Sequence, residues 1–297
     1  MICLRSLFAL ASIGLAHAAV YQRQAISTLS STQIDAFAPF THFASTAYCN
    51  PSTTINWSCG ANCDANPDFQ PVISGGDGSG TQFYYVGFSP SLSSVIVAHQ
   101  GTDPQKLLAD LTDLDFFPEP LDPSLFPGVP STVAAHSGFA NEHAKTAQAI
   151  LTAVQDTLTA QGASSVTVVG HSLGAALALL DGVSLSLQLS PGVTVNVIGY
   201  GMPRVGNQDF ANFVDSRLGG LVTHVNNQDD PVPTVPGRFL GFHHASGEIH
   251  IQDSGDWDAC PGQDNPSDLC IVGDVTNILD SNVNNHLGPY AGITMGC

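Results

Sequence analysis

The sequence predicts an α/β fold, in which a mostly parallel sheet carries helices on both faces. Between residues 94 and 225, short β-branched apolar segments alternate with longer segments of helical periodicity. This βαβα order is typical of parallel sheets, because each connection between parallel strands has to cross one face of the sheet. The 297-residue chain also lacks a low-complexity linker, which favours one large hydrophobic core.

The N-terminal residues have the pattern of a secretory signal peptide. Arg5 supplies positive charge, residues 7–15 are apolar, and Ala-His-Ala at residues 16–18 is a suitable cleavage site. This apolar run is too short to span a bilayer, and no later segment has the length and apolarity of a membrane anchor. We therefore expect a signal peptide over residues 1–18 and a single soluble, extracellular domain over residues 19–297.

An even number of cysteines remains after removal of this signal peptide. Cys3 leaves with it, so six of the seven cysteines stay in the mature chain. In a secreted protein this predicts three disulfides, which we expect to be two short loop bridges and one bridge between the ends of the domain. A zinc site is disfavoured because no histidine lies near the cysteines at ligand spacing. The expected pairs are Cys59 with Cys63, Cys260 with Cys270, and Cys49 with Cys297.

One sequence fits N-glycosylation, at Asn56, which is followed by Trp57 and Ser58. Asn50 and Asn265 are each followed by proline, which excludes modification there. We therefore expect a glycan at Asn56.

The mature chain is strongly acidic. Loss of Arg5 leaves six of the seven basic residues against 25 acidic ones, so the net charge is about −19. Nucleic acids and anionic bilayers are disfavoured as partners, because this charge would repel both. Any interface that the protein visits should therefore be neutral, with binding driven by apolar contact.

The domain is expected to begin with a helix and a pair of strands. Residues 31–48 carry apolar side chains at helical spacing, and a cysteine-bridged loop over residues 49–70 follows. Strands are expected at Val72 and at residues 83–88. The glycine-rich segment 75–80 between them is interpreted as a turn, because a phosphate loop would need a Gly-Lys-Ser/Thr sequence and a following helix.

A strongly apolar strand over residues 94–98 leads into a polar turn that contains Gly101 and Thr102. In doubly wound folds, ligands bind beyond the carboxyl ends of strands. The amide and hydroxyl of Thr102 could therefore both donate to a bound group. The alternative is an ordinary strand-to-helix turn in which Thr102 caps the helix.

Residues 104–117 have the pattern of an amphipathic helix. Because this segment directly follows the polar turn and precedes the proline-rich residues 118–130, we expect a mobile flap over the strand ends rather than a core helix. Asp110, Asp113 and Asp115 lack the glycine and terminal glutamate of a calcium loop. The apolar residues of the expected flap are Leu107, Leu108, Leu111, Leu114 and Phe117.

The rest of the chain continues the alternation of strands and helices and ends in a helix. The expected elements are a strand at 131–136, a helix at 141–159, strands at 193–200 and 221–225 with a helix at 206–218 between them, a hairpin around 246–247 that ends in 248–251, and a C-terminal helix near 275–285.

The most informative segment is the Gly-His-Ser-Leu-Gly sequence at residues 170–174. A β-branched run precedes it and an alanine- and leucine-rich helix follows, which is the strand-turn-helix context of a nucleophile elbow. The turn would raise Ser172 above the sheet, and Gly170 and Gly174 would avoid Cβ collisions. The Leu173 amide at the helix start and Thr102 are then candidate donors to an oxyanion. The alternative is an ordinary glycine-bounded turn.

A serine nucleophile needs a histidine base and a carboxylate that orients it. Asp229 and Asp230 follow the expected strand at 221–225, and we favour Asp230 because prolines stiffen the chain just after it. Among the late histidines we favour His286, because it ends the last expected helix in a loop that can reach over the sheet. The other candidate bases are His243, His244 and His250.

These residues resemble the secreted fungal class 3 lipases of the α/β-hydrolase fold. Met202 departs from the smaller or polar residue often seen at that position of the family, which affects local packing. The proline-rich segment 118–130 is similar to a basidiomycete-like branch in which some members prefer mono- and diacylglycerols. The motifs that carry the resemblance are Gly101-Thr102, His136-x-Gly-Phe139, Gly170 to Gly174, Gly201-Met-Pro-Arg-Val-Gly-Asn207, Asp230-Pro-Val-Pro233 and Asn285-His-Leu-Gly-Pro-Tyr290.

The resemblance implies a secreted triacylglycerol lipase that works without metal or organic cofactor. It implies Ser172 as nucleophile, Asp230 as acid, His286 as base, Thr102 and Leu173 as oxyanion donors, and a flap over residues 103–117. The expected partner is an acylglycerol at a neutral lipid–water interface, met by a monomer that does not insert stably into the membrane. The alternatives are a mono- and diacylglycerol-selective lipase and a soluble-ester hydrolase such as a feruloyl esterase. A non-catalytic binding protein is disfavoured because every side chain of the triad is present.

Overall fold

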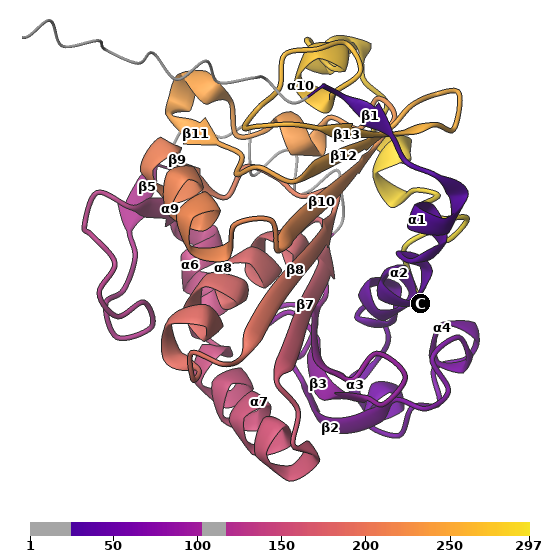
Figure 1. Cartoon of the computed structure of the whole chain (residues 1–297), viewed down its shortest axis with the longest axis vertical. Coiled ribbons are helices and arrows are strands. Elements are labelled where there is room, and N and C mark those ends of the chain that lie inside the picture. Colours follow the sequence, from indigo (N-terminus) through magenta and orange to yellow (C-terminus); the bar gives the residue numbers. More distant parts are fainter. Residues whose placement is uncertain (1–24, 103–116) are drawn as a thin grey trace, which may run out of the picture.

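The computed structural model describes residues 25–102 and 117–297. Its central feature is a nine-stranded sheet in the order β1-β13-β12-β10-β8-β7-β4-β3-β2 (Figure 1). Five neighbouring strands, from β12 to β4, run parallel, and the strands outside them are antiparallel. These strands are β1 (Ser27–Thr28), β2 (Gln70–Gly75), β3 (Tyr84–Ser89), β4 (Ser94–His99), β7 (Ser165–His171), β8 (Thr194–Tyr200), β10 (Val222–Asn227), β12 (Glu248–Ile251) and β13 (Trp257–Cys260).

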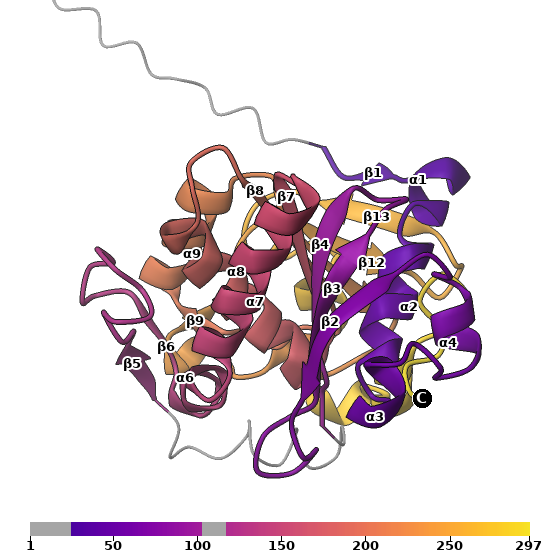
Figure 2. The same cartoon turned by 90° about the horizontal axis from the view of Figure 1, so that it is seen from below.

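Helices cover both faces of this sheet, as the sequence predicts. Figures 1 and 2 show α6, α7, α8 and α9 on one face and α1 to α4 with the C-terminal segment on the other. The helices are α1 (Ser31–Asp35), α2 (Ala38–Thr46), α3 (Pro51–Thr54), α4 (Ala61–Asp64), α6 (Ser137–Ala144), α7 (Ala147–Gln161), α8 (Leu173–Gln188), α9 (Gln208–Leu218) and α10 (Ile271–Asp274), with 3₁₀ turns η1 (Val232–Thr234), η2 (Arg238–Leu240), η3 (Ile278–Asp280) and η4 (Val283–Leu287).

The sheet separates two hydrophobic cores. In β4, Val95 and Val97 pack into the core under α7 and α8, whereas Ile96 and Ala98 pack into the core under α2. Successive side chains of a strand point to opposite faces, so a strand buried on both faces has to be apolar throughout. This explains the apolar run from Val95 to Ala98 in the middle of β4.

A second, small sheet lies beside the first and has the order β11-β9-β6-β5. The strand expected at 131–136 forms in this sheet as β6, over its last three residues. The expected hairpin around 246–247 is wrong. Instead β11 pairs with β9, and β12 runs parallel to β10. The strands are β5 (Pro118–Pro120), β6 (Ala134–His136), β9 (Gly206–Asn207) and β11 (Phe242–His243).

Two expected helices are divided in the structure. The helix expected at 31–48 forms α1 and α2, because Pro39 has no amide hydrogen to continue the hydrogen-bond ladder across the junction and so sits in the first turn of α2. The helix expected at 141–159 begins earlier and breaks between α6 and α7 at residues 145–146. The expected loop at 49–70 also contains the short helices α3 and α4.

The expected C-terminal helix at 275–285 is wrong. The chain forms α10, η3 and η4 in this region instead. The side chains of Asn277 and Asn282 accept hydrogen bonds from the amides of Leu279 and Asn284, respectively. Such local bonds from asparagine compete with continuous helix and start a new turn each time.

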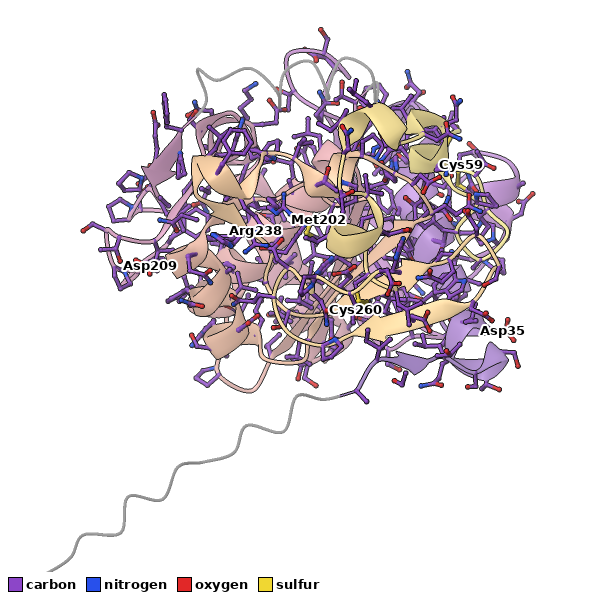
Figure 3. All side chains as sticks on the ribbon, turned by 90° about the horizontal axis from the view of Figure 1, so that it is seen from above. Asp35, Cys59, Met202, Asp209, Arg238 and Cys260 are labelled. Atoms are coloured by element: carbon purple, nitrogen blue, oxygen red, sulfur yellow. A yellow bond between two sulfur atoms is a disulfide. The ribbon has the colours of Figure 1, made fainter. Side chains whose placement is uncertain are left out.

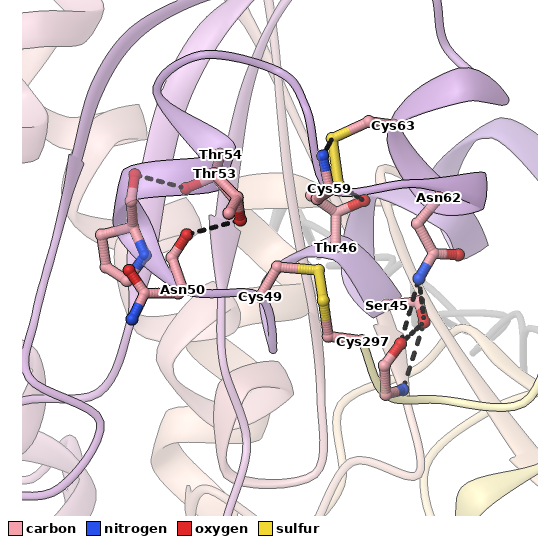
Figure 4. Close-up of a disulfide and its surroundings, with 12 residues drawn as sticks. Ser45, Thr46, Cys49, Asn50, Thr53, Thr54, Cys59, Asn62, Cys63 and Cys297 are labelled. Atoms are coloured by element: carbon pink, nitrogen blue, oxygen red, sulfur yellow. Dashed lines mark hydrogen bonds between the residues drawn. A yellow bond between two sulfur atoms is a disulfide. The ribbon is translucent and has the colours of Figure 1, made fainter.

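Three disulfides join the cysteine pairs that the sequence analysis expects: Cys49–Cys297, Cys59–Cys63 and Cys260–Cys270. Figure 4 shows the first, which fastens the C-terminus beside α2. Ser45 Oγ donates to the Gly296 carbonyl at 2.7 Å, and Asn62 Nδ2 donates to the same oxygen at 3.0 Å. Among the helices of residues 25–102 and 117–297, none combines the length and apolarity needed to cross a bilayer.

We expect the disulfides to contribute unequally to stability. The Cys49–Cys297 bridge closes a loop with a sequence separation of 248, whereas the Cys59–Cys63 bridge closes one of 4. Because a cross-link restricts the unfolded chain more when the loop is longer, replacing both cysteines by alanine should lower the free energy of unfolding by about 5 kcal/mol for the first pair and about 2 kcal/mol for the second. Guanidinium denaturation of the two double variants measures this, and equal losses would contradict it.

Candidate active site

Ser172 occupies a sharp turn between β7 and α8. It is the single residue between the strand and the helix, and its backbone has φ 62° and ψ −130°, a left-handed conformation that is unfavourable for a residue with a Cβ atom. The Ser172 amide donates to the Tyr200 carbonyl at 2.9 Å, and the Ser172 carbonyl accepts from Ala175 at 3.0 Å. This is the geometry of a nucleophile elbow.

The two glycines of the motif are required by close backbone contacts. A Cβ added to Gly170 would lie 2.1 Å from the carbonyl oxygen of Gly174, and one added to Gly174 would lie 2.2 Å from that of His99. No side chain fits at either position without moving the strand or the helix. The spacing of the motif therefore follows from the packing of α8 against β7 and the end of β4.

Asp230 and His286 form a hydrogen-bonded pair in the interior. Asp230 lies in the turn after β10 and His286 in η4, and both side chains have 0% exposure. The His286 Nδ1 atom lies 2.7 Å from Asp230 Oδ2, while Asp230 Oδ1 accepts from the Val232 amide at 2.9 Å. A carboxylate accepts only, so Nδ1 carries the proton and Nε2 is left as the atom that can accept one.

The imidazole of His286 lies beside the elbow. Its ring packs on that of His171, with 4.4 Å between centroids, and a Cβ added to Gly201 would lie 2.8 Å from its Cε1 atom. Gly201 follows Tyr200, the residue that holds the Ser172 amide. Neither Ser172 Oγ nor His286 Nε2 has a hydrogen-bond partner among the described residues, although both are buried. A serine–histidine contact that tightens only when substrate binds would leave both atoms in this state.

Two backbone segments adjoin the nucleophile. Leu173 is the first residue of α8, where amide hydrogens have no acceptor within the helix. Gly101 lies on the other side, so close that an added Cβ would be 2.8 Å from the Ser172 Cβ. Half-buried Thr102 is the next residue in the chain. Leu173 thus adjoins Ser172 in the chain, and Gly101, which precedes Thr102, contacts it from the other side.

The comparisons with known proteins agree with this geometry. A model of the family "Lipase (class 3)" matches residues 96–240. A secreted mono- and diacylglycerol lipase of Malassezia globosa is 36% identical over 217 residues, which cover 72% of this chain and 69% of the relative. The chain belongs to the class 3 lipase family.

Solved structures support the same membership. The triacylglyceride lipase of Rhizomucor miehei superposes with a TM-score of 0.76 at 26% identity, covering 91% of this chain and 98% of that one. A triacylglycerol lipase described as having a catalytic centre formed by a serine protease triad matches with the same TM-score, identity and coverage. This class 3 lipase is therefore a serine-type hydrolase with the α/β-hydrolase fold, and its relatives named as secreted agree with an extracellular location.

The three alternative bases have other roles in the lipase. His243 contacts Asp264 with 3.2 Å between Nδ1 and Oδ2, and His244 Nε2 donates to the Pro233 carbonyl at 2.7 Å. Burial lowers the pKa of His244 to about 3, so it stays neutral. His250 Nε2 lies 3.1 Å from the carbonyl of Gln228. Of these histidines, the structure places only His286 against Asp230.

The remaining expected residues take no part in the contacts around Ser172 and His286 described above. Asp229 is half-buried, and its carbonyl accepts from the amide of Asn282. Met202 is fully buried, with its methyl group packed over Gly199, and Figure 3 shows it in the interior of the molecule. The expected flap residues Leu107, Leu108, Leu111 and Leu114 lie outside the described residues, and Phe117 is 61% exposed.

Two side chains at the site, those of His171 and Tyr48, are not among the site residues predicted from the sequence. His171 precedes the nucleophile and is fully buried, and its Nδ1 atom is 2.6 Å from the hydroxyl of Tyr48. His171 could have been singled out from the sequence, because it is a polar residue at the end of a largely apolar strand. Nothing in the local sequence of Tyr48 distinguishes it from a residue of the expected N-terminal helix.

One group of three candidate metal ligands occurs in the part of the lipase that the structure describes. It consists of Glu248, Cys260 and Cys270. The two sulfur atoms are joined to each other in a disulfide, so neither is available as a thiolate ligand. The Glu248 carboxylate accepts instead from the Ile271 amide at 2.7 Å, and burial raises its pKa to about 7.

Proposed function

We propose that Ser172, His286 and Asp230 are the nucleophile, base and acid with which this lipase hydrolyses acylglycerols. The observation that carries the proposal is the buried 2.7 Å contact between His286 Nδ1 and Asp230 Oδ2, which leaves Nε2 of His286 as the atom that can accept a proton. A serine hydroxyl becomes nucleophilic when such a base accepts its proton.

The proposed reaction is a two-step acyl transfer. His286 Nε2 accepts the proton of Ser172 Oγ as the oxygen attacks the ester carbonyl, and Asp230 stabilises the imidazolium that forms. The tetrahedral intermediate collapses to an acyl-enzyme, and His286 returns the proton to the departing glycerol oxygen. Water then enters, gives its proton to His286 and releases the fatty acid, after which Ser172 regains its proton.

We assign the Leu173 amide and the Thr102 amide and hydroxyl to the oxyanion. Their support is the position of Leu173 at the start of α8 and the close contact of Gly101 with Ser172. Donors at these places would meet the negative charge as it develops, and loss of one donor should lower turnover by about 10²–10³-fold.

The substrate is proposed to meet the enzyme through apolar contact. A cavity of about 430 Å³ lies beside the loop that follows Asp230, and its lining includes Val235, Phe239 and Ile278. Phe239 is 84% exposed and Ile278 45% exposed. With a formal net charge of −18, the protein suits a neutral lipid–water interface better than an anionic one.

The proposal also includes features of the chain outside the site. They are the flap over residues 103–117, the signal peptide at residues 1–18, the single domain over 19–297, the monomeric state and the glycan at exposed Asn56.

Triacylglycerols are the first candidate substrates, and mono- and diacylglycerols are the second. The first are favoured by the solved triacylglycerol lipases, and the second by the Malassezia relative, which is named for partial glycerides. The soluble-ester alternative is not favoured by either comparison.

Hydrolysis of trioleoyl-, dioleoyl- and monooleoylglycerol emulsions by the purified protein tests this function. We expect fatty acid release from at least one of them and a jump in rate when tributyrin exceeds its solubility limit. A serine-reactive phosphonate should stop the reaction at one equivalent per chain. Hydrolysis of soluble feruloyl or acetyl esters without any acylglycerol activity would contradict it, and unchanged emulsion activity in Leu111→Asp would contradict the flap.

A further inference from the structure

We propose that His171 and Tyr48 form a positioning bridge. The bridge fixes the backbone of His286 relative to the turn at Gly101 and Thr102, which we call the oxyanion turn. The proposal rests on the function proposed above, because it takes His286 as the base. Neither residue of the bridge touches the reacting atoms in this role. Both would act by fixing the place from which the imidazole works.

The hydrogen bonds of His171 define its protonation state. Its Nε2 atom lies 2.7 Å from the His286 carbonyl oxygen, which can only accept, so Nε2 carries a proton and donates it. Its Nδ1 atom lies 2.6 Å from Tyr48 Oη. Burial and the neighbouring His286 both lower the pKa of His171 well below its usual value, so the ring is neutral and Nδ1 accepts from the Tyr48 hydroxyl.

Tyr48 connects this ring to the oxyanion turn. A Cβ added to Gly101 would lie 2.2 Å from Tyr48 Oη, so the backbone of the turn rests directly on the hydroxyl. Burial raises the pKa of Tyr48, and this effect is larger than the lowering of the pKa by the hydrogen bond from the Gly101 amide. The hydroxyl therefore remains protonated and continues to donate. The chain of contacts runs from Gly101 to Tyr48, to His171 and to the carbonyl of His286.

The bridge spans segments that the sequence places far apart. Tyr48 belongs to the turn after α2, and His286 lies in η4 near the other end of the chain. The disulfide from Cys49, the residue after Tyr48, to Cys297 joins the same two segments. Tyr290 adds a second anchor, since its hydroxyl donates to the His286 carbonyl at 3.1 Å. His286 thus lies in the five-residue 3₁₀ turn η4, and its carbonyl accepts hydrogen bonds from both His171 and Tyr290.

A neutral histidine suits this position for an electrostatic reason. His286 becomes an imidazolium during the reaction, and the two rings are 4.4 Å apart between centroids. A second positive charge at that separation would oppose proton transfer to His286. The Tyr48 hydroxyl donates a hydrogen bond to Nδ1, the one atom of His171 that could accept an additional proton. The bridge therefore orients the base and keeps a competing charge away from it.

Three variants test the bridge: His171→Phe removes both hydrogen bonds, His171→Gln keeps an amide donor near the Nε2 position, and Tyr48→Phe removes one oxygen atom. Tyr85→Phe is the matched control, because its buried hydroxyl donates to the Phe43 carbonyl at 2.7 Å away from the site. The measurements are kcat and KM on a soluble p-nitrophenyl ester, with active sites counted by phosphonate titration.

We expect His171→Phe to lower kcat per titrated site by about 10²-fold, since a misplacement near 1 Å has an effect of that size. Tyr48→Phe should lower it by about 10-fold, His171→Gln should recover most of the loss, and KM should stay within about twofold of wild type, because no contact with substrate changes. Tyr85→Phe should keep kcat.

A kcat per titrated site in Tyr48→Phe equal to that of Tyr85→Phe would overturn the bridge, even if His171→Phe failed to fold. So would a loss in His171→Phe that His171→Gln does not recover at all. Failure of the proposed function looks different: the wild-type protein would show no esterase activity, or Ser172→Ala would retain it.

Discussion

Ser172→Ala is expected to lower kcat on tributyrin by about 10⁶-fold, to a rate near that of the oxyanion donors acting alone. The reason is that no other hydroxyl lies on the elbow between β7 and α8, so water would have to attack without covalent catalysis. The measurement is fatty acid release by titration, together with mass spectrometry after incubation with a phosphonate. The variant should gain no phosphonate mass.

Ser184→Ala is the matched control for this change. Ser184 is also buried and lies on α8, where its hydroxyl donates to the Leu125 carbonyl at 2.9 Å. Its loss should leave kcat within about twofold and remove only two hydrogen bonds, the one to Leu125 and the one accepted from Gln188 Nε2, at about 1 kcal/mol each. A Ser172→Ala protein that still forms the phosphonate adduct would show that another residue is the nucleophile.

Asp230→Asn is expected to lower kcat by about 10⁴-fold with little change in KM. The Asn amide can donate to His286 Nδ1, which favours the tautomer with its proton on Nε2, and that atom can then no longer accept the Ser172 proton. The Val232 amide can still donate to the Asn carbonyl oxygen in place of Asp230 Oδ1, so the turn should keep its shape. Initial rates on a soluble ester and on an emulsion measure the effect.

Asp229→Asn separates this effect from a change of charge. Asp229 adjoins Asp230 but is half-buried, and its backbone carbonyl rather than its carboxylate is bonded to the amide of Asn282. We expect its kcat to remain within about twofold of wild type. If Asp229→Asn shows the large loss and Asp230→Asn does not, the assignment of the acid is wrong.

The parts of the fold that could be predicted from the sequence are those fixed by local pattern. The strand at residues 94–98 is apolar from Val95 to Ala98 because both faces of β4 are covered, and the elbow follows from two glycines whose Cβ atoms would collide with backbone. These signals need no knowledge of distant residues. The same holds for the two short-range disulfides, whose cysteines are close in the chain.

The errors occur where partners come from elsewhere in the chain. The segment at residues 246–247 resembled a hairpin turn, but Gly247 instead brings the backbone against Val222, and β12 joins β10 as a parallel neighbour. In the C-terminal segment, Asn277 and Asn282 start separate turns in place of one helix. Periodicity describes a segment by itself, and these choices depend on what the segment packs against.

The sequence by itself determined the α/β architecture and the elbow at Ser172, because glycine geometry and strand periodicity are local properties. It did not separate Asp229 from Asp230 by any physical contact, nor did it reveal Tyr48 and His171 beside His286. Those were decided by the tertiary structure, since hydrogen bonds between residues 56 to 123 positions apart form only where the sheet and the C-terminal disulfide bring both partners within about 3 Å.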